Sequence, residues 1–92
     1  MSNVIESNIT IINKLGLHAR AAAKLVNVAS KHACEIEIGL PDRMVNAKSI
    51  MSVMLLAAAQ GTELRLRTNG DDAHDAHQAV TAIINNRFDE AE

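Results

Sequence analysis

The chain has 92 residues, of which 48% are hydrophobic and 22% are charged. This length favours one domain over residues 1–92, because two smaller units would each bury too little apolar area, and the hydrophobic content excludes a disordered chain. Nine basic and eleven acidic residues give a net charge of −2, and one phenylalanine is the sole aromatic residue. The local charge of +2 over residues 1–60 is too weak for nucleic-acid binding, and the chain has almost no rings that could stack on bases.

The cysteine count and the apolar runs predict a cytoplasmic protein. Cys34 is the single cysteine, which excludes an internal disulfide and a paired metal–thiolate site. The first residues lack the basic and apolar regions of a signal peptide. The longest apolar run, residues 53–59, is far shorter than the roughly 20 residues that span a bilayer. We therefore expect no membrane association, no metal and no cofactor.

The first part of the chain predicts a strand followed by a helix. Residues 8–12 alternate in polarity, as a strand does, and the polar segment that leads to Gly16 ends them. Residues 19–31 predict a helix, with Arg20 and Lys24 one turn apart on its polar face. The apolar face of this helix contains Ala22, Leu25, Val26 and Ala29.

The rest of the chain predicts three strands and two helices. Residues 34–38 alternate strictly and predict a half-buried strand, and residues 43–47 return after a turn that contains glycine and proline. An apolar helix over 49–60 comes next, followed by an alternating strand over 62–68. Residues 69–88 predict a third helix with acidic residues at its start. Its expected buried face contains Ala73, Ala76, Val80, Ile83, Ile84 and Phe88.

The predicted order of elements is β-α-β-β-α-β-α, and each strand has one apolar face. The arrangement that buries all these faces is an α+β open-faced β-sandwich. It contains a four-stranded, mostly antiparallel sheet with three helices on one face, and its other face is open to water. No repeat, low-complexity segment or internal linker divides the chain.

The second predicted helix has too many apolar positions for one buried stripe. We expect Gly61 to end this helix, and we expect Val53, Leu56, Ala57 and Gln60 to face the sheet. That leaves a second apolar side formed by Ile50, Met51, Met54 and Leu55. This side is either additional core, because methionine fills gaps, or an exposed patch that docks partners.

Ser49 precedes this helix and has two interpretations. Its hydroxyl can act as an N-cap, which satisfies free backbone amides and contributes about 1 kcal/mol. It can also be a phosphorylation site, because the helix dipole tolerates a phosphoserine there. Phosphorylation would place about two negative charges beside the apolar patch.

A histidine and an arginine stand at the start of the first helix. Gly16 allows a sharp turn, so His18 falls at the helix N-terminus and Arg20 in its first turn. The free amides there, the Arg20 guanidinium and Lys24 suit a phosphate group, and a positive helix end keeps an imidazole neutral and nucleophilic at pH 7. Two alternatives remain: His18 is a cap without chemistry, or an acid–base residue, although no carboxylate or hydroxyl partner lies nearby in sequence.

The other histidines and the cysteine have ordinary structural interpretations. His74 and His77 are three residues apart, with aspartates nearby, and could in principle share a metal ion on one helix face. A solvated helix surface is the favoured interpretation of this pair. We expect His32 to be an exposed loop residue and Cys34 to be part of the core.

Two segments resemble one known family. Residues 13–25, NKLGLHARAAAKL, are similar to the active-site signature of HPr, the histidine-containing phosphocarrier of the bacterial phosphoenolpyruvate-dependent phosphotransferase system. Residues 45–58, VNAKSIMSVMLLAA, resemble its regulatory-serine segment. The resemblance covers essentially the whole chain. It implies an open-faced sandwich and a carrier rather than a stand-alone enzyme. Phospho-enzyme I would phosphorylate His18 on Nδ1, Arg20 would hold the phosphoryl group, and an enzyme IIA protein would accept it.

The resemblance also implies regulation and docking surfaces. Ser49 matches the serine that an HPr kinase/phosphorylase modifies in many relatives. Enzyme I and enzyme IIA would dock on a surface that contains Ala21, Lys24, Ile50, Met51 and Met54, and the protein would act as a monomer in sugar transport or regulation. An alternative is a signalling-only binding module that works through Ser49 and the apolar patch.

Two details qualify the match to the family. The family often has proline after the arginine, where this chain has Ala21, and proline at a helix start is favourable but not required for chemistry. Residues 84–90, INNRFDE, are similar to the nitrogen-regulatory branch and to proteobacterial relatives with regulatory roles. The downstream acceptor is therefore open between sugar transport and nitrogen regulation.

Overall fold

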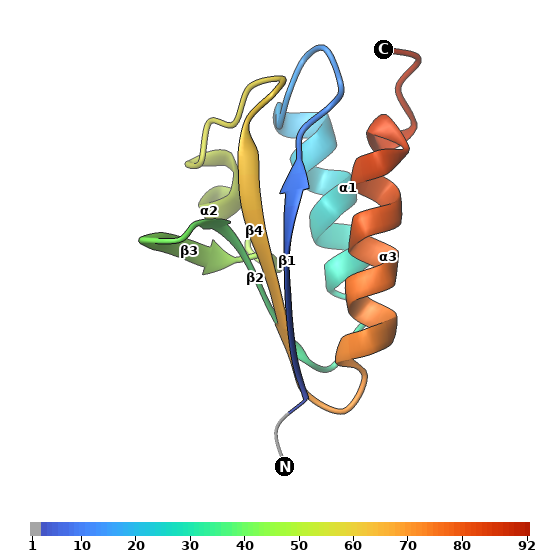
Figure 1. Cartoon of the computed structure of the whole chain (residues 1–92). Helices are drawn as coiled ribbons and strands as arrows, with labels where there is room; N and C mark the ends of the chain where they lie inside the picture. Colours follow the sequence, from blue (N-terminus) through green and yellow to red (C-terminus); the bar gives the residue numbers. More distant parts are fainter. Residues whose placement is uncertain (1–2) are drawn as a thin grey trace.

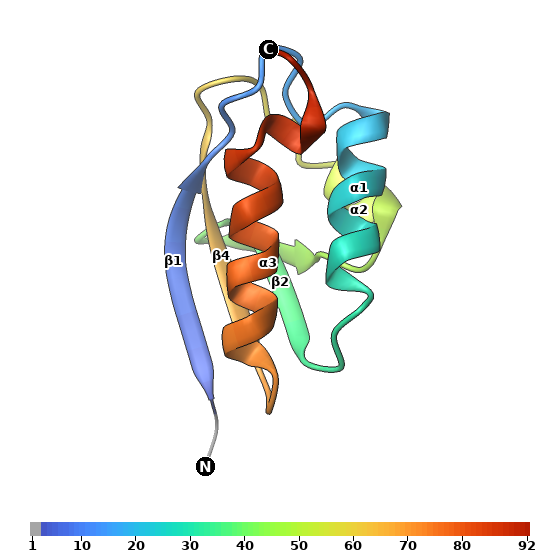
Figure 2. The same cartoon turned by 90° about the vertical axis from the view of Figure 1, so that its right-hand side faces the viewer.

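The computed structural model describes residues 3–92 and has the predicted β-α-β-β-α-β-α order (Figure 1). One antiparallel sheet in the order β1-β4-β2-β3 contains β1 (Val4–Thr10), β2 (Glu35–Leu40), β3 (Arg43–Asn46) and β4 (Glu63–Asn69). The helical elements are α1 (Ala19–Ala29), α2 (Ile50–Met54), α3 (Ala73–Asn85) and the 3-10 turn η1 (Arg87–Asp89). Figure 2 shows the helices in front of one sheet face, which confirms the predicted sandwich.

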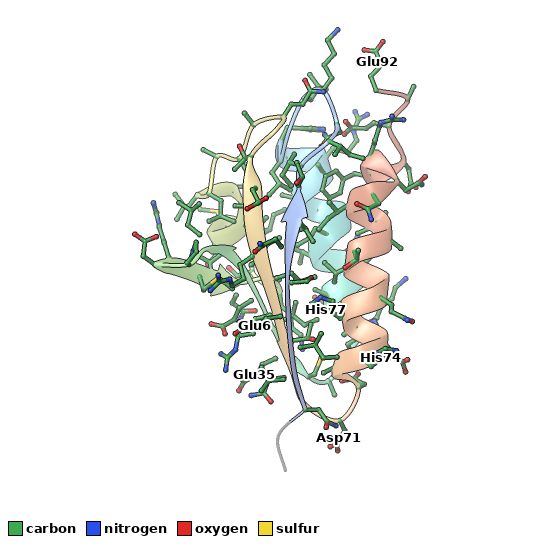
Figure 3. All side chains as sticks on the ribbon, in the orientation of Figure 1. Glu6, Glu35, Asp71, His74, His77 and Glu92 are labelled. Atoms are coloured by element: carbon green, nitrogen blue, oxygen red, sulfur yellow. The ribbon has the colours of Figure 1, made fainter. Side chains whose placement is uncertain are left out.

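The two faces of the sheet differ as alternation predicts. On β4, Leu64 and Leu66 point into an aliphatic core between the sheet and the helices. On the other face, the Arg67 Nε lies 3.1 Å from Oε1 of Glu6, and its Nη1 lies 3.0 Å from Oε1 of Glu37. Figure 3 shows Glu6 on the side of β1 away from α1 and α3. The open face is therefore polar, as predicted for a two-layer fold.

The first two elements differ from their predictions mainly at their ends. β1 begins at Val4 and ends at Thr10, because its whole length pairs with β4 from Val4↔Asn69 to Thr10↔Glu63. The helix predicted over 19–31 begins at Ala19 and ends at Ala29. Three of its four predicted apolar positions are fully buried, and the fourth packs against the core as a partly buried side chain.

The prediction of a helix over 49–60 is wrong in its length, because α2 ends at Met54. The chain that follows pairs with the loop after β1 instead: the Leu17 N–H donates to the Ala58 carbonyl at 2.8 Å, and the Gly61 N–H donates to the Ile11 carbonyl at 2.7 Å. Gly61 therefore does not cap α2. Two positions of the predicted sheet-facing stripe, Ala57 and Gln60, are exposed, whereas Val53 is buried and Leu56 packs against the core.

The helix predicted over 69–88 is also shorter. α3 ends at Asn85, and residues 87–89 have φ values of +55°, +52° and +64°, which turn the chain back toward α1. Phe88 is fully buried at the centre of this turn. Because non-glycine residues rarely adopt positive φ, the burial of Phe88 holds a conformation that the local sequence does not favour.

Asp72 stands at the N-cap of α3 but its side chain does not cap the helix. Its carboxylate instead accepts hydrogen bonds from the backbone N–H groups of Ala33 and Cys34, each at 2.9 Å. These bonds hold the pKa of Asp72 below its usual value. The aspartate that the sequence suggests as a helix cap therefore fastens the start of β2 to α3.

Candidate functional site

His18 occupies the N-cap position of α1 with an extended backbone, as predicted. Its side chain makes no capping hydrogen bond and is 29% exposed. The first helical hydrogen bond runs from Ala22 N–H to the His18 carbonyl at 2.8 Å, so the N–H groups of residues 19–21 precede the helical ladder. Because the imidazole does not cap the helix, those amides remain directed at the site and available to an anion.

Gly16 shapes the loop that delivers His18. Its φ is +70°, and a Cβ added there would lie 2.5 Å from the Ala58 carbonyl oxygen. The neighbouring Leu17 N–H donates to that same carbonyl. A side chain at position 16 would therefore clash with the segment after α2, which gives the glycine of the motif a packing reason in addition to its turn.

The structure supplies the carboxylate partner for His18 that no nearby residue of the sequence offers. His18 Nε2 contacts Oε2 of Glu90, a residue 72 positions further along the chain. The Glu90 side chain is 17% exposed. Figure 2 shows the C-terminal segment beside the loop that precedes α1. Sequence analysis missed Glu90, because no local pattern signals that the C-terminus folds back over the first helix.

Asn13 is a second site residue that sequence analysis missed. It is fully buried, and its Nδ2 donates to the Gly16 carbonyl at 2.8 Å and to Oε1 of Glu90 at 3.0 Å. One amide therefore joins the loop that precedes α1 to the side-chain carboxylate of Glu90. Burial opposes ionisation of Glu90, but the hydrogen bonds from Asn13 and His18 and the charges of His18 and Lys24 outweigh it and lower the pKa of Glu90.

The two basic residues predicted beside His18 have different environments. Arg20 is exposed in the first turn of α1, and within residues 3–92 its side chain makes no hydrogen bond or ion pair. Lys24 donates from Nζ to the Phe88 carbonyl at 2.9 Å and lies 3.5 Å from Oδ2 of Asp89. Arg20 is therefore free to reach a phosphate, whereas Lys24 holds the C-terminal turn in place.

The residues predicted to form a partner surface divide into exposed and buried ones. Met51 is 70% exposed and Leu55 64%, and Ile50 and Met54 are also exposed, so these four side chains are an exposed apolar patch rather than additional core. Ala21 is fully buried, which corrects its assignment to the partner-binding surface. Its place against the core follows from the apolar face of α1.

Ser49 is the N-cap of α2, as predicted. Its Oγ accepts a hydrogen bond from the Ser52 N–H at 3.4 Å, and the residue is half-buried. The residue that follows it, Ile50, is part of the exposed patch. The capping interpretation is thus observed, and a phosphate on this hydroxyl would lie beside the patch.

The remaining histidines and Cys34 have separate environments. Among residues 3–92 no group of three or more His, Cys, Asp or Glu side chains is arranged to hold a metal. His74 is exposed, but His77 is buried between β1 and α3, which corrects its predicted place on a solvated surface (Figure 3). His32 is half-buried, with Nδ1 3.5 Å from Oδ2 of Asp72, rather than an exposed loop residue. The predicted core position of Cys34 is confirmed.

A family model described as the PTS HPr component phosphorylation site matches residues 5–86. The chain belongs to the HPr family. It is 56% identical to phosphocarrier protein HPr of Pseudomonas putida over 85 residues, which cover 91% of this chain and 94% of the relative. It superimposes on a crystal structure of HPr from Thermoanaerobacter tengcongensis with a TM-score of 0.91 and 42% identity, over 96% of this chain and 99% of that one.

A relative that is named NPr is less similar. Phosphocarrier protein NPr of Shewanella violacea is 40% identical over 87 residues, which cover 95% of this chain and 96% of the relative. Relatives named HPr from several proteobacteria are 47–56% identical. The family and the fold that the resemblance implies are therefore both confirmed. In the part of the chain that the structure describes, no helix is long and apolar enough to cross a membrane.

Proposed function

We propose that this protein carries a phosphoryl group on His18, accepting it from phospho-enzyme I and passing it to an enzyme IIA protein. The observation that carries the proposal is the combination at the start of α1: an imidazole that does not cap the helix, free amides, and an Arg20 side chain without a partner among residues 3–92. Membership in a family of phosphocarriers supports it. The proposed transfer moves a phosphoryl group from one protein to the next and needs no cofactor.

The proposed chemistry follows from the groups at this helix end. A ring nitrogen of His18 attacks phosphorus, and the bond between phosphorus and the donor breaks. The transferred group carries negative charge, which the amides of the first helical turn and the Arg20 guanidinium stabilise. Because Arg20 lies on the exposed side of α1, it can follow the phosphoryl group as it arrives and leaves.

We propose that the patch of Ile50, Met51, Met54 and Leu55 docks both partners in turn. Exposed apolar residues of this size mark interaction surfaces, and methionine adapts to different partners. The chain would act as a monomer, since each encounter must leave the patch and His18 accessible. The chain is more similar to relatives named HPr than to the relative named NPr. This favours an enzyme IIA acceptor of the kind that serves HPr over one that serves NPr.

We propose Ser49 as a second, regulatory phosphorylation site. Its hydroxyl is at the N-terminus of α2 and beside the patch, so a phosphate there would be compatible with the helix but would oppose apolar docking. The alternative function, a signalling-only module, uses the same serine and patch. Under that alternative, His18→Ala would retain function and Ser49→Asp would lose partner binding.

The decisive experiment mixes the protein with enzyme I and labelled phosphoenolpyruvate. We expect one acid-labile phosphoryl adduct that is absent from His18→Ala and present in His74→Ala, which removes an exposed histidine on α3. An acid-stable adduct, or an adduct that persists in His18→Ala, would contradict the proposal. Subsequent addition of enzyme IIA should discharge the label from His18.

A further inference from the structure

The carboxylate of Glu90 touches only one of the two ring nitrogens of His18. Oε2 of Glu90 meets Nε2, whereas no hydrogen bond within residues 3–92 involves Nδ1 of His18. The ring is therefore held on one side and open on the other. Which nitrogen carries the proton decides which one carries the nucleophilic lone pair.

The hydrogen bonds around Glu90 indicate the position of that proton. Asn13 is buried, and its Nδ2 donates to both the Gly16 carbonyl and Oε1 of Glu90. Oε1 is thus an acceptor, and the pKa of Glu90 is lowered, so the carboxyl is ionised and Oε2 can only accept. His18 Nε2 must then be the donor. A neutral imidazole protonated on Nε2 has its lone pair on Nδ1.

We propose that Glu90 is a positioning residue for phosphoryl transfer: its carboxylate fixes the proton of His18 on Nε2 and so presents the Nδ1 lone pair to phosphorus. The inference rests on the proposed function of His18 as the phosphoryl carrier. It assigns a role to a residue outside the two motifs, supplied by the C-terminal segment rather than by the active-site loop.

The transfer balances without movement of a proton. The Nδ1 lone pair of His18 forms a bond to phosphorus, and the N–P bond of the donor phosphohistidine breaks, returning its electron pair to the donor ring. The His18 ring then bears phosphate on Nδ1 and hydrogen on Nε2, and is cationic. The Glu90 carboxylate faces this cation at Nε2 and stabilises it, as a carboxylate stabilises an imidazolium in hydrolases. Passing the group onward reverses these steps.

The C-terminal segment is built to deliver this carboxylate. The fully buried ring of Phe88 anchors it two residues before Glu90. Lys24 of α1 binds the Phe88 carbonyl at 2.9 Å and lies 3.5 Å from Asp89. A carboxylate on a free tail would lose rotational and translational freedom on meeting His18, whereas the anchored segment has already lost most of it.

The inference is tested with Glu90→Ala, Glu90→Gln and Glu90→Asp, using phosphoramidate as a small phosphoryl donor that needs no protein docking. We expect phosphorylation of His18 to slow about tenfold in Glu90→Ala, the lower end of the loss seen when a partner that orients a metal-bound imidazole is removed. Glutamine has one acceptor where Asn13 and His18 supply two donors, so its rate should be intermediate. Aspartate keeps the charge and should restore part of the rate.

A spectroscopic readout separates positioning from a structural effect. Long-range proton–nitrogen NMR spectra should show the Nε2–H tautomer of neutral His18 in the wild type and a mixture of tautomers in Glu90→Ala. Glu92→Gln is the matched control, because Glu92 pairs with Lys14 at 3.4 Å and both side chains are largely exposed. This control should change neither the rate nor the tautomer.

The outcomes distinguish the inference from the proposed function. If wild-type His18 is phosphorylated but Glu90→Ala keeps the wild-type rate and tautomer, the role of Glu90 is refuted and the carrier function stands. If no variant, including the wild type, accepts phosphate on His18 from either phosphoramidate or phospho-enzyme I, the carrier function itself is overturned. Circular dichroism of each variant checks that the fold persists.

Discussion

Two histidines in this molecule are held by side chains from distant segments, with opposite results. His18 is partly exposed and contacts a carboxylate through Nε2 alone. His77 is buried, its Nε2 lies 2.7 Å from the Ser7 hydroxyl, and its Nδ1 lies 3.2 Å from the Thr68 hydroxyl. Within residues 3–92, the His18 ring thus has one nitrogen without a hydrogen bond, whereas both nitrogens of the His77 ring are in hydrogen bonds.

The hydrogen-bond directions around His77 can be assigned in the same way as those around His18. Thr68 Oγ1 donates its one proton to the Ala73 carbonyl at 3.1 Å, so it must accept from Nδ1–H of His77. Nε2 of His77 then accepts from Ser7. The two rings therefore carry their protons on different nitrogens. A histidine whose two ring nitrogens are both in hydrogen bonds has a structural role. A histidine with one nitrogen bound to a carboxylate and a free lone pair on the other can act as a nucleophile.

The largest expected effect comes from a change at Phe88, which should disturb the surroundings of His18 but not those of His77. Phe88→Ala removes the buried anchor of the C-terminal segment and should lower the free energy of unfolding by about 3–5 kcal/mol. His18 should also lose its Glu90 partner, while the hydrogen bonds of His77 should persist in the molecules that remain folded. Denaturant unfolding measures the first effect, and NMR tautomers of the two rings measure the second.

Phe88→Leu is the matched variant, because it keeps an apolar anchor and should cost less than about 1.5 kcal/mol. An unchanged His18 environment in Phe88→Ala would show that the C-terminal segment does not depend on this anchor.

The next effect tests the structural histidine. His77→Ala removes the partner of Ser7 and Thr68 and should lower the free energy of unfolding by about 1–3 kcal/mol, while phosphorylation of His18 continues. His74→Ala, on the exposed side of the same helix, should change stability by less than about 0.5 kcal/mol. Chemical denaturation of both variants makes the comparison. Equal stability of the two would show that the buried network contributes nothing.

The contrast between the two sites also shows how far the sequence can be interpreted. Local periodicity was sufficient for the order of elements and the faces of the strands, and the position of His18 followed from a glycine turn before a helix. The partners of both histidines were beyond reach, because Glu90 and Ser7 come from segments that meet only in the folded chain. Asp72 illustrates the same limit: it has the sequence position of a helix cap, yet binds the start of β2.

The length of α2 was missed for a related reason. Residues 55–60 are good helix formers, but backbone hydrogen bonds from Leu17 and to Ile11 hold the segment after Met54 in another conformation. A pairing with the loop after β1 therefore overrides the local preference. Ala57, with a φ of +48°, adopts a conformation that its own propensity opposes.

Acidification should affect the two sites in different pH windows. Burial first, and then the neighbouring His74, lower the pKa of His77 below its ordinary value of 6.5. As the pH falls through 6.5, the unfolded chain binds a proton that folded His77 resists, so stability declines. The lowered pKa of Glu90 acts in the same sense but at lower pH: its stabilisation is complete above the ordinary carboxyl pKa and is lost only as pH falls further.

Unfolding free energies of the wild type and His77→Ala between neutral and acidic pH test these windows. Their difference should shrink as pH falls through 6.5, because the variant lacks the proton-resisting ring. A constant difference across this range would show that His77 has the same pKa in both states.

The smallest expected effect concerns Cys34, a third titratable group, which burial keeps chemically inert as it does His77. Desolvation, together with a hydrogen bond to Asp72 and the charge of that residue, raises the pKa of the thiol to about 11. Because the thiolate is the reactive form, native Cys34 should react with iodoacetamide at pH 8 about 100-fold more slowly than an ordinary thiol. The denatured chain is the control, since it exposes the same cysteine without its surroundings. Native and denatured rates within about threefold of each other would mean that the Cys34 thiol is accessible and has ordinary reactivity. Burial would then suppress the chemistry of His77 but not that of Cys34.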